Sequence, residues 1–325
     1  MNRYALVEAV QDIIGYSCDE PVHLDAVTKQ LMRPGFVLHP NAPCRSARLT
    51  LNVYEAVHGG IGKAAIFGAA AVELQMEAAF IFDKVADGEL TESDGLTSAE
   101  ALALAITIMN CGSIAACQAV DFAKAGQFAL LPLLKLHSNI VSSCAGQFLD
   151  AHLERLDAAS VGDAVRMTLL KSGSLGRLAA EFGAALATHN LHVIKLCGDL
   201  GHHAFAYAQL IDDLRDVWPT DFAKGDLARH KKTVPVAFFY ETMLQSPSNN
   251  GLNSHSLASY GATGALRESF EESAAESYCA IVAELYLDRA KAVLKELGDR
   301  LGEVKNLEQF LESLGASAAG ALAVG

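Results

Sequence analysis

The sequence is poor in aromatic residues, poor in basic residues and without the alternation that strands produce. Aromatic side chains make up 7% of the 325 residues, and 25 Lys and Arg face 38 Asp and Glu, for a formal net charge of −13. Nucleic acid and anionic membranes carry negative charge themselves, so an acidic surface disfavours both as main partners. Ala, Leu and Gly are abundant and β-branched runs are short, which favours helices packed through small side chains.

The chain also lacks any Cys-x-x-Cys pair, although it contains seven cysteines. They are odd in number and scattered, at positions 18, 44, 111, 117, 144, 197 and 279. This usage is not typical of a disulfide framework or a zinc site, and it indicates a reducing cytosol. The first residues carry acids early and do not have the shape of a signal peptide. We therefore expect a cytoplasmic protein.

One stretch, residues 101–120, carries no charge over 20 residues, which is long enough to span a bilayer. It contains Asn110, Ser113 and Gln118, however, and acids flank it. A helix that is apolar all round is also what the centre of a large helical bundle requires. We expect a buried core helix here and no transmembrane anchor.

The apolar periodicity predicts an all-α fold, a single large helical bundle of about ten helices. We expect one domain over residues 1–325, with 1–44 and 315–325 peripheral. Residues 18–44 and 246–264 read as irregular, and the last eleven residues as frayed. The expected helices cover residues 2–16, 46–58, 61–85, 98–124, 130–158, 161–187, 191–217, 235–244, 266–297 and 307–314.

The segment from Gln209 to Pro235 carries the clearest chemical pattern. Asp212 and Asp216 are spaced i,i+4, so they share one face of a helix, with Asp213 beside them. Three acids so close together repel one another. The repulsion is relieved if the carboxylates share a hard divalent cation such as Mg²⁺.

A basic stretch follows these acids. Pro219 ends the helix, and Lys224, Arg229, Lys231 and Lys232 come after it. Acids that hold a metal beside cations that hold phosphate describe a diphosphate site. Taken alone, the segment would also fit a solvated acidic helix end.

A second acid pair lies upstream. Asp83 and Asp87 repeat the i,i+4 spacing at the end of an apolar helix. Two acids at a helix end are common by themselves. Together with the acids after Gln209, they form two carboxylate clusters that could close on one shared diphosphate–Mg²⁺ group.

Six motifs, in order between about residues 40 and 240, resemble those of the trans-isoprenyl diphosphate synthases, also called the polyprenyl synthetase family. They are Arg45-Ser46-Ala47-Arg48, Asp83-Lys84-Val85-Ala86-Asp87, Gly146-Gln147-Phe148-Leu149-Asp150, Lys171-Ser172-Gly173, Gln209 with Asp212-Asp213 and Asp216, and Asp226 with Lys231-Lys232-Thr233-Val234-Pro235. The resemblance implies an isoprenoid synthase fold with its helices around a central prenyl pocket. Family members are usually homodimers, so it also implies a homodimer.

The resemblance further implies roles for individual residues. Two or three Mg²⁺ ions would be held by Asp83, Asp87, Asp212, Asp213 and Asp216. The catalytic residues around the leaving diphosphate would be Lys171, Gln209 and Lys231. The substrate-binding residues would be Arg45, Arg48, Phe80, Gln147 and Lys232.

The sequence departs from the family pattern in four places. Lys84 replaces an acid of the first Asp-rich motif, and residues 88–95 lack the paired arginines that follow it in the family. Met76 stands where a histidine is frequent, and Leu49 stands in place of the proline after the early basic pair. The half that ionises an allylic diphosphate is therefore better preserved than the half that binds isopentenyl diphosphate.

We expect a Mg²⁺-dependent prenyltransferase that acts on an allylic isoprenoid diphosphate and releases pyrophosphate. Its acceptor need not be isopentenyl diphosphate, and the branch that prenylates a peptide tryptophan also lacks the arginine pair. The alternative is a class I terpene synthase that converts a substrate such as farnesyl or geranylgeranyl diphosphate. A non-catalytic subunit of a heteromeric synthase is least favoured, since the second acidic motif is intact. A helical scaffold would leave the ordered acidic and basic clusters unexplained.

Overall fold

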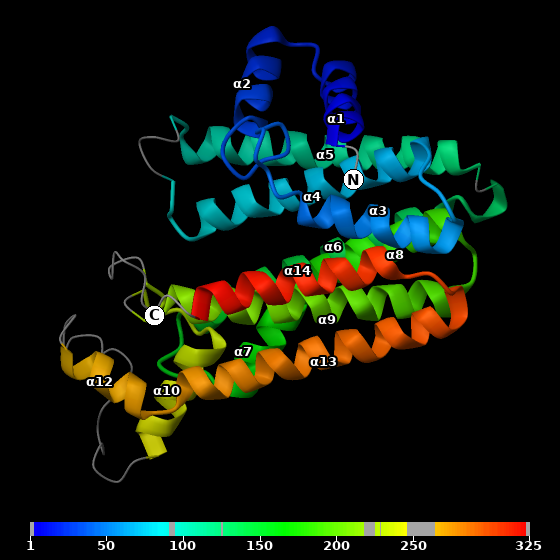
Figure 1. The fold of residues 1–325 in the computed structure, drawn as a ribbon. Coiled ribbons are helices and arrows are strands. Elements are labelled where there is room, and N and C mark those ends of the chain that lie inside the picture. Colours follow the sequence, from blue (N-terminus) through cyan, green and yellow to red (C-terminus); the bar gives the residue numbers. More distant parts are fainter. Residues whose placement is uncertain are drawn as a thin grey trace. The chain divides into compact units, whose positions relative to one another are not determined.

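The computed structural model describes residues 3–90, 95–124, 126–217, 225–227, 229–245 and 264–322. All regular elements within these ranges are helical, which confirms the predicted all-α fold (Figure 1). The α-helices are α1 (Arg3–Ser17), α2 (Pro21–Leu31), α3 (Arg45–His58), α4 (Lys63–Ala86), α5 (Ser98–Ala123), α6 (Leu130–Leu153), α7 (Val161–Thr168), α8 (Ser174–Ala187), α9 (Leu191–Asp216), α10 (Val234–Gln245), α12 (Gly264–Glu272), α13 (Ala275–Leu301) and α14 (Lys305–Leu322). A 3₁₀ turn covers Gly126–Phe128, and a π-helical turn covers Leu169–Gly173 between α7 and α8.

The chain forms two compact units. Unit 1 comprises Met1–Asn139, Arg177–Gly201 and Leu294–Phe310, and unit 2 comprises Ile140–Gly176, His202–Val293 and Leu311–Gly325. The expectation of one domain over residues 1–325, with a central prenyl pocket, stays a prediction.

Unit 1 is built on α4 and α5, which lie side by side in Figure 1. Small residues let the two helices approach closely: a Cβ on Gly112 would lie 3.0 Å from the Ala71 carbonyl oxygen. Gln75 crosses the same contact and donates from Nε2 to the Met109 carbonyl at 2.9 Å. The abundance of Ala and Gly thus produces the close helix packing that the composition predicts.

Three of the expected boundaries are wrong. Residues 18–44 are not wholly irregular, because α2 begins at Pro21, and proline fits the first position of a helix, where no N–H is needed. The expected helix 266–297 is divided into α12 and α13 next to Ala274, which has a φ of 60°. The last helix, α14, extends to Leu322, well past the expected residue 314.

The expectation that residues 101–120 form a helix buried all round is also wrong. One face of α5 is buried through Leu104, Ile108 and Ala115, but Leu102 and Ile106 are 37% and 49% exposed. By length and composition alone, the helices Lys63–Ala86, Ser98–Ala123 and Gly126–Leu153 could each cross a membrane. Their most apolar windows are 67%, 50% and 22% buried, so the last helix leaves most of its apolar surface open.

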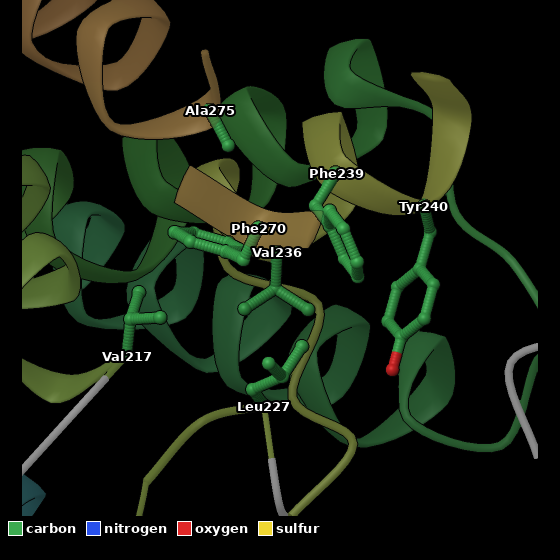
Figure 2. Close-up of a cluster of buried hydrophobic side chains, with 7 residues drawn as sticks. All are labelled: Val217, Leu227, Val236, Phe239, Tyr240, Phe270 and Ala275. Atoms are coloured by element: carbon green, nitrogen blue, oxygen red, sulfur yellow. The ribbon is translucent and has the colours of Figure 1, made fainter. Parts of the chain in front are cut away.

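In unit 2, an aromatic cluster holds the segment after α9 against the helices that follow it (Figure 2). Leu227 of that segment lies with Val236 and Phe239 of α10 and with Phe270 of α12. The full cluster is Val217, Leu227, Val236, Phe239, Tyr240, Phe270 and Ala275. Val217 directly follows the predicted acids of α9 and Leu227 precedes Lys231 and Lys232, so this packing holds a residue next to each of the two predicted charged groups.

Candidate functional site

In unit 2, the C-terminal turns of α9 carry the predicted acids in different environments. Asp213 is 3% exposed, and its Oδ1 accepts a hydrogen bond from Gln209 Nε2 at 2.8 Å. Its Oδ2 is buried and has no hydrogen-bond partner among the described residues. Asp212 is more open and pairs with Arg215 at 2.8 Å, while Asp216 is exposed. The helical spacing therefore aims one carboxylate inward and leaves the other two near solvent.

The buried carboxylate of Asp213 lies among other acids. Burial raises its pKa well above the ordinary value, and the charges of Asp226, Asp212 and Asp150 raise it further. The hydrogen bond from Gln209 acts in the opposite direction. An ionised Asp213 would add negative charge to this cluster of acids, and a bound cation would compensate that charge.

Gln209 is held from both sides. Its amide nitrogen donates to Asp213, and its oxygen accepts from Ser172 Oγ at 2.7 Å. Ser172 belongs to the π-helical turn and Gln209 to α9, so one amide joins two of the predicted motifs. The amide has a fixed orientation because each end has its own partner.

Lys171 lies on the π-helical turn and points toward α6. Its Nζ is 2.7 Å from Asp150 Oδ2, and Asp150 is 4% exposed. Ser143 of α6 donates to the Lys171 carbonyl at 2.9 Å. Two motifs that are 21 residues apart in the chain therefore meet through a nearly buried ion pair.

Gly146 makes this meeting possible. A Cβ at position 146 would lie 2.1 Å from the Lys171 backbone nitrogen, closer than any side chain tolerates. Glycine is required here by the close approach of two backbones. Gln147, the next residue and a predicted substrate contact, is half-buried on the same helix.

The segment after α9 returns to the end of that helix. The Asp226 N–H donates to the Asp216 carbonyl at 2.8 Å, and Thr233 Oγ1 donates to Asp226 Oδ2 at 2.9 Å. Burial raises the pKa of Asp226 to about 6, and the charges of Asp216 and Asp150 also raise it. Pro219 and Lys224 lie outside the described residues.

The two lysines of this segment have protein partners. Lys231 Nζ is 2.6 Å from Glu154 Oε1, and Lys231 is 7% exposed. Lys232 is 1% exposed, donates to the His230 carbonyl at 3.0 Å and lies 5.6 Å from the centre of the Tyr240 ring. Burial lowers the pKa of Lys232. Lys231 therefore belongs to the acidic cluster, whereas the Lys232 ammonium is held inside the unit.

The residue types of unit 2 fit Mg²⁺. Carboxylate oxygens are the ligands that this hard cation prefers, and the unpartnered Asp213 Oδ2 lies in an excess of negative charge. In the part of the chain that is described, no three His, Cys, Asp or Glu side chains are arranged as ligands of one ion. The acids have the required chemistry but are not gathered into a complete coordination shell.

In unit 1, α4 carries the other acid pair at its C-terminal end. Asp87 caps the helix, its N–H donates to the Asp83 carbonyl at 2.9 Å, and both side chains are half-buried. Lys84 Nζ lies 5.7 Å from the centre of the Phe80 ring. Since unit 1 holds this pair and unit 2 holds the other acids, a diphosphate–Mg²⁺ group shared by both stays a prediction.

Phe80 does not have the buried environment of a tunnel wall within unit 1. Phe80 is 52% exposed, and its ring packs edge-on against the Phe36 ring, with 5.6 Å between the ring centres. The early basic pair lies on α3, where Arg45 is exposed and the Arg48 guanidinium lies 5.7 Å from the centre of the Phe310 ring.

Four residues that hold these side chains in place were not among the predicted site residues. Asp150 pairs with Lys171, and Glu154 pairs with Lys231. Asp150 ends one of the six motifs, but the sequence assigned it no role. Arg3 binds the segment before Arg45, and Glu73 accepts a hydrogen bond from the Ala47 N–H just after it. Neither lies in a chemical motif that a local reading would select.

Comparison with known proteins identifies the family of this chain. The model of the polyprenyl synthetase family matches residues 44–260. No curated protein sequence matches the chain.

Solved structures of low sequence identity share the fold. Geranylgeranyl pyrophosphate synthetase from Pyrococcus horikoshii Ot3 aligns with a TM-score of 0.71 at 19% identity, covering 96% of this chain and 94% of that one. Polyprenyl synthase from Caulobacter crescentus CB15, complexed with calcium and isoprenyl diphosphate, gives 0.75 at 18% identity, covering 96% and 92%. Decaprenyl diphosphate synthase from Rhodobacter capsulatus gives 0.75 at 17% identity, covering 96% of each chain. The protein belongs to the polyprenyl synthetase family, and this membership indicates a prenyltransferase.

Proposed function

We propose that the protein is a Mg²⁺-dependent prenyltransferase that binds an allylic isoprenoid diphosphate and releases pyrophosphate. The observation that carries the proposal is a linked set of charges in unit 2: Lys171 pairs with Asp150, and the charge of Asp150 acts on the buried Asp213. Lys231 pairs with Glu154 in the same unit, and Asp213 Oδ2 has no hydrogen-bond partner among the described residues. Lysine side chains of this kind can bind phosphate oxygens. The Caulobacter protein, whose structure holds calcium and isoprenyl diphosphate, supports the same pairing of a divalent ion with this substrate class.

Each residue has a role that follows from its contacts. Bound Mg²⁺ would supply Lewis acidity to the diphosphate leaving group, and Asp83, Asp87, Asp212, Asp213 and Asp216 would hold it. Lys171 and Lys231 would exchange part of their contact with Asp150 and Glu154 for phosphate oxygens, which stabilises the charge of the departing pyrophosphate. Gln209, fixed between Ser172 and Asp213, would present its amide at a constant position.

The acceptor is the open part of the proposal. Residues 88–95 contain no arginine, so the pair that holds isopentenyl diphosphate in the family is missing there. This observation favours an acceptor other than isopentenyl diphosphate. The same observation favours the second candidate, a terpene synthase that quenches the ionised chain internally or with water.

The test is incubation of the purified protein with Mg²⁺ and geranyl, farnesyl or geranylgeranyl diphosphate, each with and without isopentenyl diphosphate. Pyrophosphate release and organic-extractable products are measured. Longer diphosphates that form only with isopentenyl diphosphate would show ordinary elongation and contradict the weight given to the missing arginines. A hydrocarbon or alcohol formed without it would establish the terpene synthase. No pyrophosphate from any substrate would count against both candidates as autonomous enzymes.

Variants connect the activity to the site. Asp212→Ala is expected to reduce pyrophosphate release by about a hundredfold or more, because one oxygen ligand is lost beside a developing charge. Asp288→Ala removes an exposed acid of α13, paired with Lys291, and serves as the control of equal charge. Equal activity of the two variants would contradict the assignment of Asp212.

We also propose a homodimer in the cytoplasm. The apolar stripe of α6, defined as Leu130, Leu134, Val141 and Phe148, is 65% to 71% exposed at every position. Apolar residues at spacings of four and seven form a seam that a second helix covers. The cytoplasmic location is supported by the scattered cysteines, which are free thiols in this structure.

A further inference from the structure

Residues 37–47, which lead into α3 and include Arg45, are held by an arginine from the first helix. Arg3 Nη1 donates to the Ala42 carbonyl at 3.2 Å and to Cys44 Sγ at 3.3 Å. Arg3 Nη2 donates to the Val37 carbonyl at 2.9 Å and to the His39 carbonyl. A planar guanidinium can satisfy several acceptors at once in a fixed geometry, which a flexible ammonium cannot reproduce. One side chain thus closes the segment into a loop.

Two buried carboxylates of α4 hold the ends of the same segment. Glu77 Oε1 accepts from the Val37 N–H, and Glu73 Oε2 accepts from the Ala47 N–H at 2.8 Å. Both glutamates are at most 7% exposed. The segment is therefore anchored at its first and last residues by α4 and along its length by α1.

The anchored segment contains one backbone conformation that its residue disfavours. Cys44 has φ 42° and ψ 49°, in the left-handed region, and it directly precedes Arg45, the first residue of α3. A residue with a Cβ remains there only when its surroundings hold it, and such residues gather at functional sites. Arg3 contacts the Cys44 side chain itself and the carbonyl two residues earlier.

We propose that Arg3 is a positioning residue: by holding Cys44 in the left-handed conformation, it sets the direction of Arg45 for binding a diphosphate. The inference rests on the proposed function, and on the substrate-binding role that the family resemblance implies for Arg45. It extends that site to a residue of α1 that touches neither substrate nor metal. Arg45 is exposed, so its side chain can point in several directions unless the backbone before it is fixed.

The test is a double-mutant cycle on the full chain. Binding of inorganic pyrophosphate is measured by titration calorimetry for the wild type and for Arg3→Ala, Cys44→Gly, the double variant and Arg45→Ala. Thermal unfolding midpoints are recorded for each. Arg300→Ala, which removes an exposed arginine of the same unit, is the matched control. If Arg3→Ala is unfolded at the assay temperature, Arg3→Lys replaces it, since lysine keeps the charge but lacks the fork.

We expect Arg3→Ala to weaken pyrophosphate binding about tenfold, because Cys44 would leave the strained conformation. Glycine adopts positive φ without strain, so Cys44→Gly should bind within about twofold of the wild type. In the Cys44→Gly background, Arg3→Ala should also change binding by less than about twofold, although it lowers the unfolding midpoint in both backgrounds.

Three results would overturn the inference, and they separate it from the proposed function. If Arg45→Ala weakens binding and Arg3→Ala does not, the positioning role is wrong while the assignment of Arg45 stands. If Arg3→Ala weakens binding equally with Cys or Gly at position 44, Arg3 does not act through that conformation. If Arg45→Ala leaves binding unchanged, the substrate-binding role that the resemblance implies for Arg45 fails, and the positioning role fails with it.

Discussion

At the scale of single residues, Glu73 and Glu77 carry carboxyl groups inside unit 1 that ionise with difficulty. Burial raises the pKa of Glu73 to about 7 and that of Glu77 well above its usual range. The negative charge of Glu73 adds to the effect on Glu77, whereas the charge of Arg3 lowers the pKa of Glu73. The two carboxyl groups that accept hydrogen bonds from residues 37–47 are therefore buried where their ionised forms are disfavoured.

We predict that Glu73→Gln makes the stability of the protein less dependent on pH. The folded pKa of about 7 exceeds the ordinary glutamate pKa of 4.5, so the folded state binds more protons than the unfolded state between these pH values. The contribution to stability is therefore fully present below pH 4.5 and is lost as pH rises through 7. It amounts to about 2 kcal/mol between pH 5 and pH 7.5.

Urea unfolding of both proteins at pH 5 and pH 7.5 measures this difference. The wild type should lose about 2 kcal/mol more than Glu73→Gln over the interval. Glu8→Gln, an exposed glutamate of α1 in the same unit, should behave like the wild type. An equal loss in the wild type and Glu73→Gln would show that Glu73 does not titrate there.

At the scale of elements, the site depends on how closely α6 approaches the π-helical turn. The turn carries Lys171 and Ser172, and it meets α6 where Gly146 has no side chain. A π-turn inserts a residue into a helix and re-aims its side chains, and such turns are frequent at functional sites. The contact of these two elements orients Lys171 toward Asp150 and Ser172 toward Gln209.

We predict that Gly146→Ala separates these elements. Its Cβ would lie 2.1 Å from the Lys171 nitrogen, a backbone atom that cannot turn aside. We expect a loss of about 1–3 kcal/mol in the free energy of unfolding, together with a large loss of activity. Gly162→Ala is the control, because its Cβ has Ser160 Oγ as the nearest atom, at 3.6 Å. Calorimetric unfolding and pyrophosphate release are measured for both variants. If Gly146→Ala keeps the stability and activity of the wild type, the two elements can move apart without loss and the prediction is wrong.

At the scale of the whole molecule, the apolar stripe of α6 predicts that a second copy covers it. We expect the wild type to sediment as a dimer at micromolar concentration. The double variant Leu134→Glu/Val141→Glu should sediment as a monomer, because it places two charges in the seam. Ile281→Glu on α13, at a residue that is 70% exposed, is the matched control and should remain a dimer. A monomeric wild type, or a dimeric double variant, would contradict the prediction.

Much of the fold and of the site chemistry could be predicted from sequence. The helices α3, α4, α5 and α9 lie within two residues of their expected ranges, because helical periodicity is a local property. The expected helix 130–158 ends at Leu153, and the expected helix 161–187 is divided into α7 and α8 by the π-helical turn. The family follows from motifs whose order needs no tertiary information. The error at α2 arises because a proline can either interrupt a helix or begin one, as Pro21 does. The division between α12 and α13 occurs next to Ala274, whose positive φ its residue type does not predict.

The sequence alone determined the all-α class, the acidic and basic motifs and the family, since each depends on residues within a few turns of one another. Only the tertiary structure decided which charges pair. Lys171 meets Asp150 across 21 residues, and Arg3 reaches residues 37–44 across 34 to 41. Such contacts depend on how closely helices pack, as Gly146 shows. The raised pKa of Asp213 is likewise a property of the folded unit. It arises from burial and from the charges of Asp226 and Asp150, which lie in separate parts of the chain.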